Sequence, residues 1–225
     1  MVPGDLTDPG GLADHLGGAE AVFVVWPFLT GHGADEVVDI LARHTRRIVY
    51  LSAEAAAKRP DSSWASVERA IERSATEWTF LRPTGFAANT LMWADQIRQS
   101  GVVRWVYGQA SRSLIHKRDI AAVAVRALTE DGHAGARYVL TGPDTLTQAE
   151  QAHAIGDVLG RDVRWEELSR EEVRDQLAGL PDGALDTWAS FVETPELITS
   201  TVEEITGMPA RPFDEWARDY ADDFR

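Results

Sequence analysis

Four short apolar runs recur along the chain, and each is rich in β-branched or aromatic residues. They lie at residues 21–26, 47–52, 78–82 and 137–141. A run of this length and composition is typical of a buried strand in a parallel sheet. The segments between the first three runs carry apolar residues at helical spacing, so strands and helices alternate. This alternation predicts an α/β fold with a doubly wound, mostly parallel sheet.

Helices are predicted to predominate after residue 142, where strand-like runs become rare. We therefore expect a sheet-containing core over residues 1–141 and a mostly helical lobe over residues 142–225, within one structural unit. Two capping boxes are predicted in this lobe, Thr147 with Glu150 and Ser169 with Glu172. The chain closes with an apolar stripe at helical spacing, formed by Phe213, Trp216, Ala217, Tyr220 and Phe224.

Composition narrows the choice of partners and of compartment. The 36 acidic residues outnumber the 22 lysines and arginines, which gives a formal net charge of −14. This charge repels a nucleic-acid backbone, so no nucleic-acid partner is expected. The sequence contains no cysteine, which excludes disulfides and thiolate chemistry and fits a reducing cytoplasm. No run approaches the roughly 18 apolar residues of a membrane helix, so we expect no membrane partner and a cytoplasmic protein.

Several motifs follow one another in the order of a known family. Together they resemble an NmrA-like, atypical short-chain dehydrogenase/reductase, and the resemblance spans essentially the whole chain. It implies a Rossmann-type core that binds NADP or NAD, and a C-terminal helical lobe that closes over a small-molecule substrate. The motifs are Pro3–Pro9, Val22–Pro27, Tyr50–Ser52, Glu77–Pro83 with Thr84-Gly85-Phe86, Ile115–Ala121 and Tyr138–Pro143.

One family feature is missing from the sequence. Members place a strand and a Gly-x-x-Gly-x-x-Gly turn ahead of the segment that here begins at Gly4, and this turn holds the pyrophosphate of the cofactor. We therefore expect a truncated Rossmann core whose first apolar run, at residues 21–26, is an exposed sheet edge. Such an edge favours a homodimer by strand pairing. An incomplete gene product, a natural truncation that dimerises and a minimal domain with a new role remain open explanations.

The resemblance assigns cofactor contacts to residues near the first apolar run. It places Asp5 and Leu6 against the adenine ring, although Asp5 also suits a turn before the next helix. It places Val25, Trp26 and Pro27 where the family's backbone passes the nicotinamide ribose, and a plain strand exit is the alternative.

Two further positions lie at predicted strand ends. Ser52 matches the position of a catalytic serine in classical members and is also assigned to the cofactor cleft, although strand ends commonly carry serine for backbone hydrogen bonding. Arg82 is assigned to the cofactor cleft as an anion contact, with packing as the alternative. The Tyr-x-x-x-Lys pair of classical members is absent, since Pro60 and Trp64 occupy the corresponding positions. Classical carbonyl reduction is therefore not expected.

Other side chains are candidates for acid–base chemistry. We select His116 and Tyr107, with Ser52, as the catalytic candidates, and we assign Asp119 to capping the helix that follows it. No set of residues has metal-ligand spacing, so no metal is expected. Three functions remain open: an NAD(P)H-dependent oxidoreductase acting on a small apolar molecule, a cofactor-independent isomerase, cyclase or lyase, and a non-catalytic redox sensor or interaction module.

Overall fold

The computed structural model describes residues 4–74, 76–176 and 183–225, and these form two compact units. The units interleave along the chain, whereas the sequence-based division separates it once, at residue 141. That division remains a prediction. Unit 1 comprises Met1–Thr84, Ile120–Leu140 and Glu204–Gly207, and unit 2 comprises Gly85–Asp119, Thr141–Glu203 and Met208–Arg225.

Unit 1 contains a four-stranded parallel sheet with the strand order β1-β2-β3-β8. The register places Val24 opposite Tyr50, and Tyr50 opposite Phe80. All four predicted strands are therefore present, and the α/β class with a parallel sheet is confirmed. The strands are β1 (Ala21–Val25), β2 (Arg47–Leu51), β3 (Glu77–Pro83) and β8 (Ala136–Leu140).

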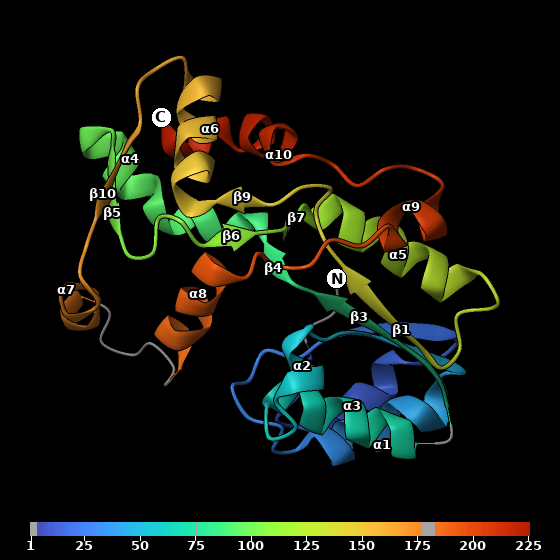
Figure 1. Cartoon of the computed structure of the whole chain (residues 1–225). Coiled ribbons are helices and arrows are strands. Elements are labelled where there is room, and N and C mark those ends of the chain that lie inside the picture. The colour runs from blue at the N-terminus through green and yellow to red at the C-terminus, as the bar shows by residue number, and fades with distance from the viewer. Residues whose placement is uncertain (1–3, 75, 177–182) are drawn as a thin grey trace. The chain divides into compact units, whose positions relative to one another are not determined.

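Helices lie on both faces of this sheet (Figure 1). On one face, buried apolar residues of α1 and α3 pack with Ile48, Tyr50 and Phe80 of the strands. On the other face lies the part of α5 that belongs to unit 1, from residue 120 onward. The helical segments of this unit are η1 (Pro9–His15), α1 (Ala34–His44), α2 (Ala55–Lys58), α3 (Ser63–Arg73) and most of α5 (Lys117–Thr129).

Strand β1 forms one edge of the sheet, as predicted. It pairs with β2 on one side, and no strand pairs with its other side among the described residues. Phe23 is 37% exposed and Val25 is 54% exposed, while Val24 between them is buried against the helices. The edge therefore presents unpaired backbone groups together with exposed apolar side chains.

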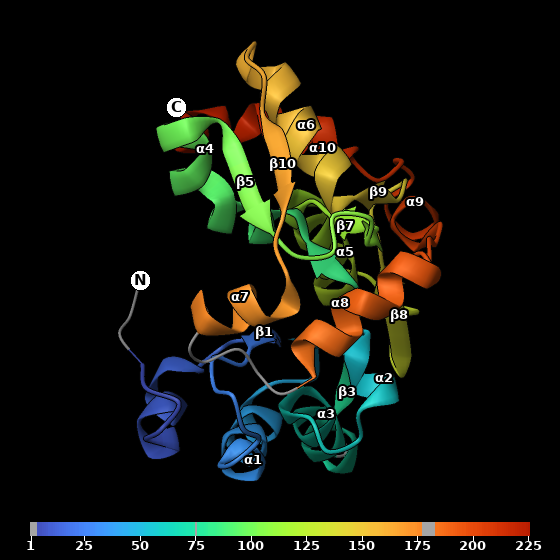
Figure 2. The ribbon, with the colours of Figure 1, turned by 60° about the vertical axis from the view of Figure 1, so that its left-hand side comes forward.

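Unit 2 is built from helices and three two-stranded sheets around an aromatic core. Figure 2 shows β5 and β10 side by side, and they pair in parallel. The pair β4–β7 is also parallel, and β6–β9 is antiparallel. The strands are β4 (Gly85–Phe86), β5 (Val102–Trp105), β6 (Ser111–Arg112), β7 (Leu114–Ile115), β9 (Leu146–Thr147) and β10 (Arg164–Glu167). The helices are η2 (Ala87–Trp93), α4 (Ala94–Ser100), α6 (Gln148–Leu159), α7 (Arg170–Gln176), α8 (Ala184–Glu193), α10 (Phe213–Asp219) and η3 (Ala221–Phe224), with α9 (Thr201–Thr206) shared between the units.

The predicted C-terminal stripe belongs to the core of unit 2. The Trp216 ring is fully buried and stacks on Phe213 and Tyr220, with ring centroids 5.4 and 4.9 Å away. Phe224 approaches the same ring edge-on at 6.1 Å. These contacts explain the helical spacing of the stripe, because residues three and four apart share one helix face.

Both predicted capping boxes form. The Thr147 hydroxyl accepts a hydrogen bond from the Glu150 backbone N–H at 3.1 Å, and the Glu150 carboxylate accepts one from the Thr147 backbone N–H at 2.8 Å. Ser169 and Glu172 make the same reciprocal pair at 3.3 and 2.8 Å. Helices α6 and α7 therefore begin where the hydroxyl–acid spacing indicates.

The predicted cap at Asp119 is wrong. Helix α5 begins at Lys117, so Asp119 lies inside its first turn. The buried Asp119 carboxylate pairs with the Arg211 guanidinium and accepts a hydrogen bond from the Arg211 backbone N–H at 2.8 Å. His116 occupies the capping position instead, because its Nδ1 accepts the Arg118 backbone N–H at 3.0 Å.

Candidate functional site

A cavity of about 330 Å³ lies in unit 1, beside the loop that follows the carboxyl end of β1. Ligands of open α/β sheets bind outside the carboxyl ends of the strands, so this position suits a ligand. The loop is held by Trp26, whose indole Nε1 donates a hydrogen bond to the Thr30 carbonyl at 2.7 Å and whose ring lies edge-on to Phe28. The cavity is lined by Leu6, Thr7, Pro9, Phe28, Thr30, His32, Gly33 and Glu36.

Asp5 and Leu6 differ in their relation to this cavity. Leu6 lines it, as a contact to a base requires. Asp5 shapes the turn before η1, because its Oδ1 accepts hydrogen bonds from the Thr7 hydroxyl at 2.7 Å and the Thr7 backbone N–H at 2.8 Å. The hydrogen bonds from the Thr7 hydroxyl and backbone lower the pKa of Asp5. Val25, Trp26 and Pro27 precede Phe28, and their predicted cofactor contacts are not tested by this geometry.

Ser52 and Arg82 meet at one buried carboxylate in unit 1. The Ser52 hydroxyl donates to Glu68 Oε1 at 2.5 Å. The Arg82 guanidinium binds the same carboxylate through two hydrogen bonds, at 2.9 Å from Nε and 2.6 Å from Nη2. The hydrogen bonds to Glu68 raise the pKa of Arg82, so its positive charge is held firmly. This arrangement ties the ends of β2 and β3 to helix α3, and any role in cofactor binding or catalysis remains a prediction.

Tyr50 adds a second buried group to this region. Its hydroxyl is buried without a hydrogen-bond partner among the described residues. Burial raises the pKa of Tyr50, and the negative charge of Glu68 raises it further, so the phenol stays protonated. In the sequence, Tyr50 is marked only by its place in an apolar strand and in the Tyr50–Ser52 motif.

His116 and Tyr107, the candidates in unit 2, are held by different partners. The His116 ring is buried; its Nδ1 accepts the Arg118 N–H, so its Nε2 carries the proton that faces Asp219 Oδ2 at 3.2 Å. Tyr107 adopts a φ of 59°, the left-handed region, in the turn after β5. The Glu167 carboxylate accepts the Tyr107 backbone N–H at 2.5 Å. Neither residue belongs to the lining of the unit 1 cavity, and their catalytic assignment remains a prediction.

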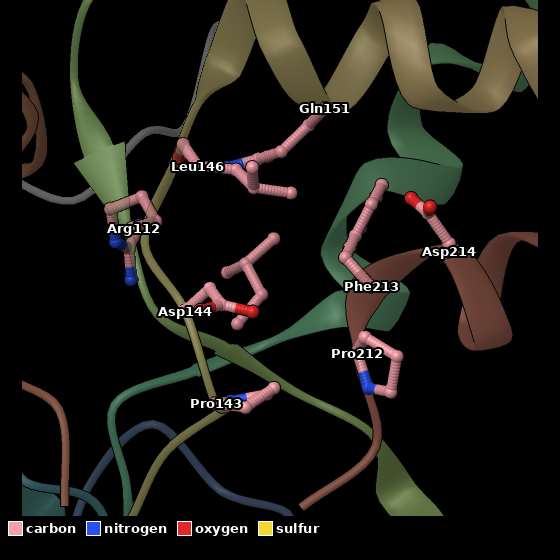
Figure 3. Close-up of a pocket in the computed structure, with 9 residues that line it drawn as sticks. Arg112, Pro143, Asp144, Leu146, Gln151, Pro212, Phe213 and Asp214 are labelled. Atoms are coloured by element: carbon pink, nitrogen blue, oxygen red, sulfur yellow. The ribbon is translucent and has the colours of Figure 1, made fainter.

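Unit 2 contains a second cavity, of about 160 Å³, that the sequence did not reveal (Figure 3). Asp144 follows Gly142-Pro143 just after a predicted strand end, where side chains of open α/β sheets often face a ligand. The sequence around Arg112, Gln151 and Asp214 does not indicate a site, because only the fold brings these three residues together. The lining residues are Arg112, Leu114, Pro143, Asp144, Leu146, Gln151, Pro212, Phe213 and Asp214.

A smaller cavity of about 60 Å³ adjoins it and shares Arg112, Leu114 and Gln151 as lining residues. Its remaining wall is largely aromatic and amide, from Asn89, Thr90, Met92, Trp93, Trp105, Gln148 and Trp188. Within residues 4–74, 76–176 and 183–225, no group of three or more His, Cys, Asp or Glu side chains is arranged to hold a metal ion. Over the same residues, no helix has the length and apolar character to cross a membrane.

Comparison with known proteins identifies the family. A reductase of (4-alkanoyl-5-oxo-2,5-dihydrofuran-3-yl)methyl phosphate from Streptomyces griseus is 37% identical over 237 aligned residues, which cover 100% of this chain and 84% of the relative. An NAD(P)H azoreductase from Xenophilus azovorans is 34% identical over 232 aligned residues, which cover 97% of this chain and 81% of the relative. The chain belongs to the NmrA-like, atypical short-chain dehydrogenase/reductase family.

Solved structures agree on the fold of this NmrA-like chain. The NADPH complex of an Escherichia coli quinone oxidoreductase superposes with a TM-score of 0.77 at 24% identity, covering 96% of this chain and 81% of that one. Triphenylmethane reductase from Citrobacter sp. gives a TM-score of 0.81 at 20% identity, covering 97% and 82%. At these identities, the superpositions support the fold and carry no conclusion about function. No protein-family model matches the sequence.

Proposed function

We propose that this NmrA-like chain is an NAD(P)H-dependent oxidoreductase that acts on a small molecule. The observation that carries the proposal is the unit 1 cavity at the carboxyl end of β1, lined by Leu6, which the family resemblance places against adenine. Family relatives that the chain matches over most of their length are named as reductases, one of them using NAD(P)H.

The lining of this cavity fits the uncharged adenosine end of the cofactor. Leu6, Pro9 and Phe28 offer apolar surface for a base, and the hydroxyl groups of Thr7 and Thr30 can bond its edge or a ribose. No lysine or arginine lines the cavity in the described part of the chain, and Glu36 disfavours a phosphate there. The pyrophosphate contacts would therefore come from groups other than these.

The proposed roles of the chain's own residues follow from this fit. The reduced nicotinamide supplies a hydride when the cofactor is bound. Leu6 and Phe28 would orient the adenine, and the Glu68 network of Ser52 and Arg82 would keep the strand ends rigid. The Ser52 hydroxyl, which donates to Glu68 at 2.5 Å, would stay the candidate catalytic group of this unit, with His116 and Tyr107 as the candidates in unit 2.

Three further expectations belong to the same proposal. The core at residues 1–141 would bind the cofactor and the lobe at residues 142–225 would bind the substrate. The exposed apolar edge of β1 favours a homodimer that pairs this strand with its symmetry mate. The cysteine-free sequence favours the cytoplasm.

A calorimetric titration with NADPH and NADH tests the cofactor site, and adjacent residues provide a matched pair of variants. Phe28 lines the cavity, whereas Leu29 is 95% exposed and does not line it. Phe28→Asp places a charge against the base and should weaken cofactor binding by about tenfold or more. Leu29→Asp should leave the affinity within about twofold, since exposed substitutions change little.

Turnover is measured separately, by following loss of the reduced nicotinamide with a quinone and an azo dye as electron acceptors. Turnover with either acceptor, with a KM for the reduced cofactor that is raised about tenfold or more in Phe28→Asp and little changed in Leu29→Asp, supports the oxidoreductase. Binding without turnover favours a redox sensor, and a cooperatively folded chain that binds neither cofactor contradicts the proposal in favour of cofactor-independent chemistry.

A further inference from the structure

The 160 Å³ cavity of unit 2 has an unbalanced charge. Asp144 lies on the turn between β8 and β9, and Asp214 lies on α10, so the two carboxylates come from different elements (Figure 3). Both residues are exposed, and neither forms an ion pair with any described residue. A ligand that enters this cavity therefore passes two negative charges.

Arg112 does not offset these charges, although it lines the same cavity. Its Nε and Nη2 bind the Glu196 carboxylate at 3.0 and 3.2 Å, and its guanidinium lies 4.7 Å from the centre of the Phe191 ring. Glu196 is buried, does not line the cavity, and also accepts the Ser113 backbone N–H at 3.1 Å. A bidentate carboxylate of this kind neutralises the guanidinium.

The rest of the lining is apolar and of a defined size. Leu114, Pro143, Leu146, Pro212 and Phe213 form most of the wall. An apolar cavity of roughly 150 Å³ accommodates one benzene ring, so this cavity of about 160 Å³ matches a ligand body of that size.

The adjoining cavity is bordered by two indoles whose N–H groups have no hydrogen-bond partner among the described residues. They belong to Trp93 and Trp105, and both Nε1 atoms are buried. Buried donors normally have an acceptor, because an unmade hydrogen bond costs about 1–3 kcal/mol. The Trp216 Nε1 lacks a partner in the same way and lines neither cavity of unit 2, so these indoles do not by themselves mark a ligand site.

We propose that the unit 2 cavity binds a small organic cation with a ring-sized apolar body, and that Glu196 determines this charge preference by neutralising Arg112. The ammonium group lies at the rim with Asp144 and Asp214, and the apolar body contacts Leu114 and Phe213. This inference deepens the proposed function, on which it rests only in calling the cation a substrate. The relative from Streptomyces griseus is named for a phosphate compound, so on this proposal the ligand of this chain carries the opposite charge.

The test compares three probes of similar shape by calorimetry, without any cofactor. Benzyltrimethylammonium carries a permanent positive charge, 2-methyl-1-phenyl-2-propanol is its neutral near-isostere, and benzylphosphonate is the anion. We expect the cation to bind about fivefold more tightly than the alcohol, and the phosphonate to bind more weakly than both. The preference for the cation should shrink as salt rises, because the carboxylates are exposed.

Variants locate the preference. Asp144→Asn combined with Asp214→Asn should lower the affinity for the cation to that for the alcohol. Asp157→Asn, on helix α6 and outside the cavity, is the matched control and should change nothing.

Substitutions in the Arg112–Glu196 pair should change the preference for the cation in opposite directions. Glu196→Gln leaves the guanidinium charge unopposed, so the cation should bind about tenfold more weakly and the phosphonate more tightly. Arg112→Gln removes that charge and should retain or increase the preference for the cation, which keeps the proposal testable if Glu196→Gln folds poorly.

Equal affinity for the cation and the alcohol, or a double variant that behaves like Asp157→Asn, would overturn the proposal. A chain that binds none of the probes overturns it as well. The cofactor titration is independent of these probes, so failure of the cation site and failure of the oxidoreductase function are distinguished.

Discussion

The two units contain the same ionic motif in different surroundings. In unit 1, Arg82 binds Glu68 through two hydrogen bonds and Ser52 donates to the same carboxylate. In unit 2, Arg112 binds Glu196 through two hydrogen bonds, and the Ser113 hydroxyl lies 3.4 Å from that carboxylate. The side chains are similarly buried, at 13% and 6% exposure in the first pair and 16% and 7% in the second.

The elements that carry the pairs differ. Glu68 lies in the middle of α3 and Arg82 near the end of β3, so the first pair joins two regular elements of the sheet unit. Arg112 lies on the two-residue strand β6, and Glu196 lies in the segment between α8 and α9. Arg112 also lines both cavities of unit 2. Similar burial therefore serves rigidity in one unit and, on our proposal, ligand selection in the other.

Removing the two carboxylates should separate these roles and gives the largest expected effect. Glu68→Ala leaves the Arg82 charge buried without its partner, which should lower the free energy of unfolding by about 3–5 kcal/mol. Glu196→Ala should cost about 1.5–3 kcal/mol, because Arg112 borders cavities that water can reach. Urea denaturation monitored by tryptophan fluorescence measures both.

Glu72→Ala is the control for the first change, since Glu72 lies one turn further along α3 and pairs with Arg137 in a more exposed position. It should cost at most about 1 kcal/mol. If Glu196→Ala destabilised the chain as much as Glu68→Ala, the contrast between the two units would be lost.

A smaller effect is expected at the capping box of α6 in unit 2. Thr147→Ala removes the hydroxyl that accepts the Glu150 N–H, and should cost about 1 kcal/mol at neutral pH. Hydrogen bonds from the Thr147 backbone and hydroxyl lower the pKa of Glu150 below its ordinary value. A lowered pKa stabilises the fold above the ordinary carboxyl range, and this contribution is lost as pH falls through the lowered value. Unfolding curves at neutral and acidic pH should therefore show the cost of Thr147→Ala decreasing in acid.

Ser62→Ala provides the comparison in unit 1. The Ser62 hydroxyl caps α3 by accepting the Ala65 N–H at 3.2 Å, but no carboxylate completes a box there. Its cost should be about 1 kcal/mol at both pH values. An equal pH dependence in the two variants would contradict the role assigned to Glu150.

The sequence predicted the features that depend on local patterns. The four sheet strands, both capping boxes and the aromatic stripe at Trp216 follow from periodicity and from short-range pairs, which the fold cannot easily override. The capping prediction for Asp119 was wrong because its carboxylate binds a distant residue, Arg211, which lies 92 positions further along the chain. The capping rule does not register such a partner.

The sites were less predictable for the same reason. Arg82 and Ser52 were both selected from the sequence, but the Glu68 carboxylate that they share becomes visible only once two strand ends and a helix are placed together. Arg112 and Glu196 are 84 positions apart, and neither belongs to a motif. The unit 1 cavity was better predicted, because Leu6, which the family resemblance assigned to the adenine contact, lines it.

The smallest expected effect on stability, and the last contrast between the units, concerns exposed valines. Val25 lies on the free edge of β1 and is 54% exposed, and Val192 lies on helix α8 of unit 2 and is 43% exposed. Replacing either by lysine should change the free energy of unfolding by no more than about 0.5 kcal/mol. The two should differ in association, because only Val25 lies beside unpaired backbone groups that a second strand can bind. Sedimentation velocity should show a dimer for the parent chain and for Val192→Lys, and a monomer for Val25→Lys. A parent chain that is monomeric at every concentration would contradict pairing through this edge, whereas a dimer that persists in Val25→Lys would place the interface elsewhere on the molecule.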